Sequence, residues 1–187
     1  MKNEKRLKYK YRSQRDNKYS PTTTCNVTAL AMALSCLGVE VSEDDLYLKA
    51  NSKRYQRYAL KIGNWIDKFI KRRKLNQVWK ILEKLADEAL GGKEKATFKS
   101  NWLTMSDIIS RINIGQPVLI SGSFTHGGHI VCVVGHNSIG LICADPWGDW
   151  NQKYKDHDGD GVLYLYDKLR PVLKGKNGKY RALVLRK

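Results

Sequence analysis

Three side chains in this sequence, Cys25, His129 and Asp145, are of the types that carry out acyl transfer by a thiol. A cysteine attacks a carbonyl as its thiolate, a histidine takes and returns the proton, and a carboxylate orients the imidazole. Cys25 directly precedes an apolar-periodic segment that predicts a helix over residues 26–37, ended by Gly38. A cysteine at a helix N-terminus faces unpaired backbone N–H groups and the positive end of the helix dipole, which favour the thiolate. We therefore predict that Cys25 is a nucleophile.

The segment 127–145 is typical of a β-hairpin that turns at Asn137. His129 and Asp145 each lie eight positions from Asn137, so a turn centred there places them directly opposite each other. Opposed residues on one face have Cβ atoms about 4.5–5.5 Å apart, which lets a carboxylate hold an imidazole through its second nitrogen. The pattern predicts a base and its orienting group, and a register slip of one residue would destroy the arrangement.

Each of these residues has an ordinary alternative role. Cys25 could be a small buried apolar side chain, as most free cysteines are, although a Thr-rich, polar approach argues against this. Asp145 could be a turn residue before a proline. His126 competes with His129 as the base but lies in the loop before two glycines, and His136 belongs to the predicted turn. The remaining cysteines lie inside apolar runs and are expected to pack in the core: Cys36, Cys132 and Cys143.

The elements that must position these residues fall into a helical part and a later sheet. A basic arm, residues 1–18, is expected to run along the surface before the Cys25 helix. Residues 42–105 predict a basic insert of two or three helices, which begins at the cap Ser42 and is broken at 91–92 by two glycines. One helical face of this insert is expected to carry Ile62, Ile66, Phe69 and Ile70.

Short β-branched runs in residues 115–187 predict the sheet. They are 118–121, 129–134, 139–144, 162–166 and 182–185. Helices followed by strands, with no internal repeat and no linker, indicate a two-lobed α+β fold in one domain over residues 1–187. A length of 187 residues and a hydrophobic content of 42% are sufficient for such a core.

The formal charge of +16 identifies a class of partners but does not choose among them. Between residues 49 and 99 there are 15 Lys or Arg against five acids. A surface of this kind attracts polyanions, which include nucleic acid and also the teichoic acids and carboxylates of a bacterial wall. No apolar run of about 18 residues predicts a membrane span, and the first residues lack the apolar stretch of a secretory signal. We expect synthesis in the cytoplasm and free thiols.

The chain resembles papain-like cysteine peptidases. The residues that carry the resemblance are Ser13-Gln14-Arg15-Asp16-Asn17, Thr24-Cys25-Asn26-Val27-Thr28 with Ala31-Met32, Gly128-His129-Ile130-Val131, and Ala144-Asp145-Pro146-Trp147-Gly148. It is most similar to the branch related to bacteriocin-processing double-glycine peptidases, and within it to phage-encoded members that cut bacterial cell wall. The resemblance implies a papain-like fold, with Cys25 as nucleophile, His129 as base, Asp145 as orienting group and Gln14 as oxyanion donor. The basic helical insert departs from the compact family pattern and could line the cleft.

Two groups of residues in the sequence resemble metal-binding patterns. His126 and His129 have His-x-x-His spacing, but no Cys-x-x-Cys pair accompanies them to close a structural zinc site. Asp156, Asp158 and Asp160 alternate before Gly161, which matches the first half of a calcium loop. The loop leads into a predicted strand and its twelfth position is an Asp, so an EF-hand is not expected. A structural Ca²⁺ and an acidic surface turn both stay open, and catalysis is expected to need no cofactor.

The expected function is a cysteine peptidase that hydrolyses peptide bonds of peptidoglycan, as a phage endolysin acting at the bacterial wall. Two alternatives stay open. The same triad could serve an intracellular processing peptidase or an amide-transferring enzyme. The charge, with aromatic residues among the lysines at 8–12, is also typical of a nucleic-acid-binding protein, which would leave the three chemical residues unexplained.

Overall fold

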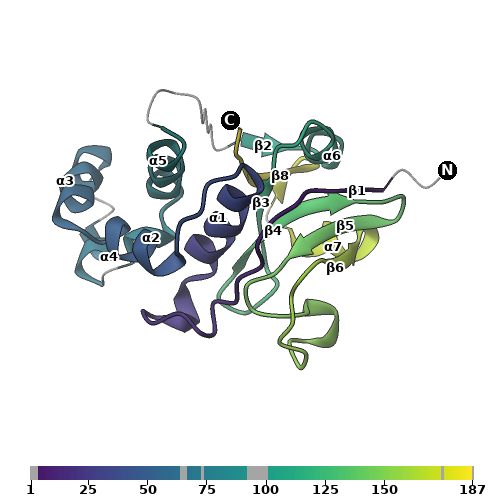
Figure 1. The fold of residues 1–187 in the computed structure, drawn as a ribbon, viewed down its shortest axis with the longest axis horizontal. Coiled ribbons are helices and arrows are strands. Elements are labelled where there is room, and N and C mark those ends of the chain that lie inside the picture. Colours follow the sequence, from purple (N-terminus) through teal and green to yellow (C-terminus); the bar gives the residue numbers. More distant parts are fainter. Residues whose placement is uncertain (1–3, 64–66, 73, 92–100, 174, 187) are drawn as a thin grey trace.

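The structure is a computed structural model that describes residues 4–63, 67–72, 74–91, 101–173 and 175–186. Its centre is an antiparallel sheet covered by helices on both faces (Figure 1). The helices are α1 (Cys25–Cys36), α2 (Glu43–Ala50), α3 (Lys53–Ile62), α4 (Asp67–Lys71), α5 (Trp79–Ala89), α6 (Met105–Asn113) and α7 (Tyr166–Val172). Three short 3₁₀ helices are η1 (Pro21–Thr23), η3 (Leu75–Gln77) and η4 (Trp150–Gln152).

The strands of the sheet are β1 (Lys5–Arg6), β2 (Asn101–Leu103), β3 (Val118–Gly122), β4 (His129–His136), β5 (Gly140–Ala144), β6 (Val162–Leu165), β7 (Gly175–Lys176) and β8 (Lys179–Val184). Their order is β2-β8-β3-β4-β5-β6, with β1 paired to β4 and β7 paired to β8. The mixture of helices with an antiparallel sheet confirms the predicted α+β class.

The two faces of the sheet carry two separate apolar cores. Helix α1 packs along β4 and covers one face, which includes Leu119, Cys132, Val134 and Ala144. Helices α2 and α5 pack against α1, α3 packs against α2, and all three add buried residues to the same core. Helices α6 and α7 cover the other face, which includes Val131, Val133, Cys143 and Tyr164. Because side chains alternate along a strand, consecutive residues of β4 and β5 belong to different cores. The cysteines at 132 and 143 are fully buried, as predicted, whereas Cys36 is partly exposed.

Helix α1 begins one residue earlier than predicted, at Cys25 itself, and ends at Cys36. Its interior from 26 to 34 is buried, so the helix is apolar on all sides and not only along a stripe. Gly38 follows with φ of 76°, the left-handed conformation that ends helices.

The insert contains more helices than the predicted two or three. Ser42 caps α2 as expected, because its hydroxyl accepts a hydrogen bond from the Asp45 N–H. The single apolar face predicted for Ile62, Phe69 and Ile70 is wrong: α3 ends before Gly63, and the other two residues lie on α4. Ile66 lies outside the described residues.

All five predicted strands are present, with small shifts at their ends. Tyr166, expected at the end of a strand, is instead the first residue of α7. Helix α6 was not predicted, although Thr104 and Asp107 form a capping box at its start that is visible in the sequence. The N-terminal arm also supplies a short strand, β1, which pairs with the end of β4.

The hairpin of β4 and β5 has a different register from the predicted one. His136 pairs with Leu141, but Val133 pairs with Cys143, and the register shifts at a β-bulge between Val133 and Gly135. Continuing the pairing past Ala144 brings Asp145 level with Val131 and not with His129. The prediction of direct opposition is therefore wrong by two positions.

A shift of two positions preserves the face of the strand, because side chains repeat every second residue. Without the bulge, Asp145 would be level with Cys132, on the opposite face from His129. The extra residue in β4 thus makes His129 and Asp145 diagonal neighbours on one face, a separation that long side chains can span.

Among the described residues, no helix is long and apolar enough to cross a membrane.

Candidate active site

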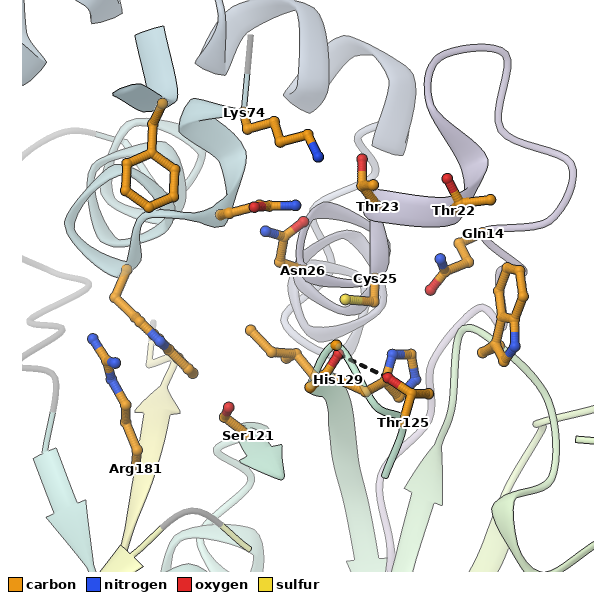
Figure 2. Close-up of a pocket in the computed structure, with 17 residues that line it drawn as sticks. Gln14, Thr22, Thr23, Cys25, Asn26, Lys74, Ser121, Thr125, His129 and Arg181 are labelled. Carbon is orange, nitrogen blue, oxygen red and sulfur yellow. Dashed lines mark hydrogen bonds between the residues drawn. The ribbon is translucent and has the colours of Figure 1, made fainter. Parts of the chain in front are cut away.

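Cys25 lies at the start of α1 and lines a cleft of about 670 Å³ between the helical part and the sheet (Figure 2). The residue before it, Thr24, does not cap the helix with its side chain. The Thr24 hydroxyl instead donates to the Ser20 carbonyl (3.2 Å) and accepts from the Asn17 amide (2.9 Å). The positive end of the helix dipole is consequently available to a thiolate or an oxyanion at Cys25.

His129 is the first residue of β4, and its Nε2 donates to Oδ1 of Asp145 at 2.6 Å. Both side chains are almost completely buried. The structure therefore brings the predicted base and orienting group together, although through the bulged register. Because Nε2 is engaged by Asp145, Nδ1 is the ring nitrogen left for Cys25.

Two further groups hold the Asp145 carboxylate, and sequence reasoning missed both. The backbone N–H of Trp147 donates to Oδ1 at 2.8 Å, and the hydroxyl of Tyr164 donates to Oδ2 at 2.7 Å. Tyr164 lies on β6, is fully buried, and accepts a hydrogen bond from the Trp150 N–H. The only sequence signal was a tyrosine in a predicted strand of otherwise apolar residues. Three donors on one carboxylate fix its position.

The environment of His129 favours its charged form. Burial lowers the pKa of His129, but the charges of Asp145 and Cys25 and the hydrogen bond to Asp145 raise it by more, to about 10. A charged imidazole beside a cysteine can supply a proton to a leaving amine. The arrangement therefore places a candidate nucleophile and a proton donor side by side.

Gln14 lies in the N-terminal arm, which crosses the molecule to the loop after β5. Its backbone N–H donates to the Pro146 carbonyl (2.9 Å), and its Nε2 donates to the Pro21 carbonyl (2.6 Å). The side chain is buried and lines the same cleft as Cys25. One N–H of Nε2 is used by Pro21, which leaves the second for a group in the cleft. Beside it, the Arg15 guanidinium stacks 3.8 Å from the centre of the Trp147 ring.

The helical insert lines the part of the cleft on the side of Cys25 away from Gln14. This agrees with the prediction that the insert could line the cleft. Phe69, Lys74 and Trp79 come from the insert, and Arg181 comes from β8. These residues were not predicted as site residues, because their approach to Cys25 depends on how the insert folds back over the sheet. The pair Asn26 and Asn76 was missed too: their side-chain amides bond to each other and join the start of α1 to η3.

The predicted calcium loop is not assembled as a metal site. Within the described ranges, no group of three or more His, Cys, Asp or Glu side chains could hold a metal ion, and this applies to both the calcium and the zinc hypotheses. The carboxylates of Asp156 and Asp158 each accept a backbone N–H two residues later, and Asp160 is paired with Arg6 and Tyr9 of the arm.

One glycine of this loop, Gly159, is bonded on both sides of its backbone. Its carbonyl accepts from the Asp145 N–H at 2.9 Å, and its N–H donates to the Tyr11 hydroxyl at 3.0 Å. Tyr11 in turn donates to the Asp145 carbonyl at 3.0 Å. The segment therefore ties the arm to the residue that orients His129.

Comparison with known proteins places this geometry in context. A model of the Peptidase_C39-like family matches residues 6–168. Among solved structures, the crystal structure of a protein described as a C39-like peptidase from Bacillus anthracis is similar in fold, with a TM-score of 0.63 and 15% sequence identity. The alignment covers 99% of this chain and 98% of that one. A comparison with curated proteins gives no match.

Proposed function

The chain belongs to the peptidase C39-like family, whose model spans most of its length, and on this premise we propose that it hydrolyses peptide bonds of bacterial peptidoglycan. Membership of the family supports a cysteine peptidase activity. One observation carries the chemical part of the proposal. Cys25, at a helix start, and His129 line the same cleft, and His129 is hydrogen-bonded to Asp145.

The proposed reaction follows from these positions. The Cys25 thiolate attacks the scissile carbonyl, while the free N–H of Gln14 and the N–H groups at the start of α1 stabilise the negative charge on the carbonyl oxygen. The His129 imidazolium gives its proton to the leaving amine, and a thioester forms between Cys25 and the acyl part. Neutral His129 then removes a proton from water, which attacks the thioester and releases the carboxylic acid and the thiol. Asp145 keeps the ring oriented in both steps.

The peptidoglycan substrate is supported by charge and by sequence resemblance. A protein of formal charge +16 is concentrated on the anionic polymers of a bacterial wall. The resemblance to phage-encoded wall-cutting peptidases adds the proposed setting, lysis of a host cell by a phage endolysin.

The experiment compares wild-type protein with Cys25→Ala on purified cell walls. We expect wild type to release peptide fragments with new amino termini, identified by mass spectrometry, and Cys25→Ala to release none while retaining its far-UV circular dichroism. Cys36→Ala, on the same helix but away from the cleft, is the matched control and should keep activity. Undiminished digestion by Cys25→Ala would contradict the thiol mechanism. An intact wall together with cleavage of a protein substrate would indicate a processing peptidase instead.

Adsorption to walls is tested separately from hydrolysis, using Cys25→Ala protein. Binding to isolated walls should weaken strongly as salt is raised from about 0.05 M to 0.5 M, because the screening length shortens several-fold over this range. Equal binding at both salt concentrations would contradict the electrostatic account.

A further inference from the structure

Two cations line the cleft on the side of Cys25 away from Gln14. Lys74 and Arg181 both belong to the lining, and Figure 2 shows them on the opposite side of Cys25 from Gln14. They come from segments that are distant in the sequence, one before η3 and one on β8. Each therefore reaches the cleft through the fold and not as part of one local basic run.

The backbone of Lys74 and the side chain of Arg181 are held by their surroundings. The backbone N–H of Lys74 donates to the Phe69 carbonyl at 2.8 Å, which fixes the turn from which the lysine extends. The Arg181 guanidinium carbon lies 5.1 Å from the centre of the Trp79 ring, a cation–π contact that orients the planar group. Phe69 and Trp79 also line the cleft, so the cations lie beside apolar rings.

No acid of the described protein compensates these charges. The cleft lining includes no Asp or Glu among the described residues, and none of the ion pairs found there involves Lys74 or Arg181. Other cations nearby differ: Lys49, Arg54 and Lys84 all pair with Glu88. Burial lowers the pKa of Arg181, but a guanidinium stays charged regardless.

We propose that the positive charges of Lys74 and Arg181 favour a carboxylate of the peptide substrate in this part of the cleft and make the enzyme selective for acidic peptides. This inference deepens the proposed function and rests on it for the peptide nature of the ligand. A lysine and a guanidinium whose charges are unpaired attract an anion that enters the cleft on their side, and the apolar rings reduce the competition of water. The carboxylate could be an acidic side chain within the peptide or the free carboxyl group at its end.

The test measures binding without cleavage, with Cys25→Ala protein and synthetic hexapeptides. The peptides are acetylated and amidated, hold Gly, Ala and Leu, and carry either Glu or Gln at one position that is scanned along the chain. Isothermal titration should show that the Glu peptide binds more tightly than the matching Gln peptide, by about tenfold or more, when the residue is at one position. At the other positions the two peptides should bind equally. A second set, with free or amidated ends, distinguishes a terminal carboxyl group from a side chain.

Matched variants show whether the cleft is responsible. In the Cys25→Ala background, Lys74→Gln with Arg181→Gln should abolish the preference, and Lys74→Glu with Arg181→Glu should reverse it toward a Lys peptide. Lys168→Gln, on the exposed surface of α7, removes a charge elsewhere and should leave the preference unchanged. Lys74→Gln alone retains the Arg181 contact with Trp79 and should weaken the preference for the Glu peptide. This single variant provides the test if the double variant does not fold.

The outcomes separate the two proposals. Equal binding of Glu and Gln peptides at every position, or a preference that survives the double variant, would overturn the carboxylate site even if walls are digested. Digestion that does not depend on Cys25 would overturn the proposed mechanism and leave the binding result intact.

Discussion

The hydroxyl of Tyr164 holds one oxygen of Asp145 at 2.7 Å while the other oxygen holds His129 at 2.6 Å. Tyr164 is fully buried and is not among the residues that line the cleft. It can therefore influence catalysis only through the orientation of Asp145 and His129, and not through contact with substrate.

Tyr164→Phe should lower kcat by about 10-fold to 100-fold and leave KM nearly unchanged, the range typical of groups that orient a functional side chain from behind. The unpaired Oδ2 should also reduce the free energy of unfolding by about 1–3 kcal/mol. Steady-state kinetics and denaturant unfolding measure the two effects. Tyr166→Phe, which loses a hydrogen bond to the Asn137 carbonyl far from Cys25, is the control for kcat. A rise in KM without a fall in kcat would contradict the positioning role.

The raised pKa of His129 predicts how stability depends on pH. The folded protein has a His129 pKa of about 10, above the ordinary value of 6.5. The folded state thus holds this proton more tightly than the unfolded chain, and its contribution to stability is complete below about pH 6.5 and is lost as pH rises toward 10. The free energy of unfolding should therefore fall across this window. Denaturant melts should show a smaller fall for His129→Asn, which removes the titrating ring, and equal falls would refute the prediction.

Gln14 provides a test of the oxyanion site. Gln14→Ala should reduce kcat by about 10²–10³-fold, the loss typical of removing one donor to a developing oxyanion. Gln14→Glu, which keeps the size but replaces the amide with a carboxylate, should be at least as inactive. Rates of wall-peptide release give the comparison, and near-normal kcat in both variants would exclude Gln14 from the reaction.

Gly159 is expected to tolerate no side chain. A Cβ at this position would collide with the Asp145 carbonyl oxygen and approach the Tyr11 hydroxyl at 2.9 Å. Gly159→Ala should lower the free energy of unfolding by about 1–3 kcal/mol and displace the loop that carries Asp145. Thermal melting of Gly127→Ala is the comparison, because an added Cβ there meets no described atom within 4 Å. Equal melting temperatures would show that the loop yields without cost.

The local patterns of the sequence were sufficient to locate α1 and the five main strands, and they paired His129 with Asp145 through a register that differs from the observed one. Each of these depends on short-range signals: apolar spacing, β-branched runs and the length of one hairpin. The prediction of one helical face from Ile62 to Ile70 failed because α3 ends before Gly63, whose φ is 152°, and apolar spacing alone does not register such a break.

What the sequence did not reveal depends on contacts between distant segments. The bulge in β4 lies where β1 joins that strand, with Lys5 opposite His136 and Arg6 opposite Gly135, so the register depends on an arm more than a hundred residues away. Tyr164 reaches Asp145 from the next strand of the sheet, and Arg181 reaches the cleft from near the C-terminus. The spacing of residues within one segment does not predict such long-range contacts.

The pairing also sets a rule for how this hairpin can change in length. Removing one residue of β4 between His129 and Val133 would turn the His129 side chain to the opposite face of the sheet from Asp145. Losing or gaining one residue there, or between Cys143 and Asp145, should therefore abolish activity, whereas the turn at 137–139 and the bulge at Val134 can absorb such a change. In related chains, single insertions and deletions in this hairpin should be confined to its turn and its bulge.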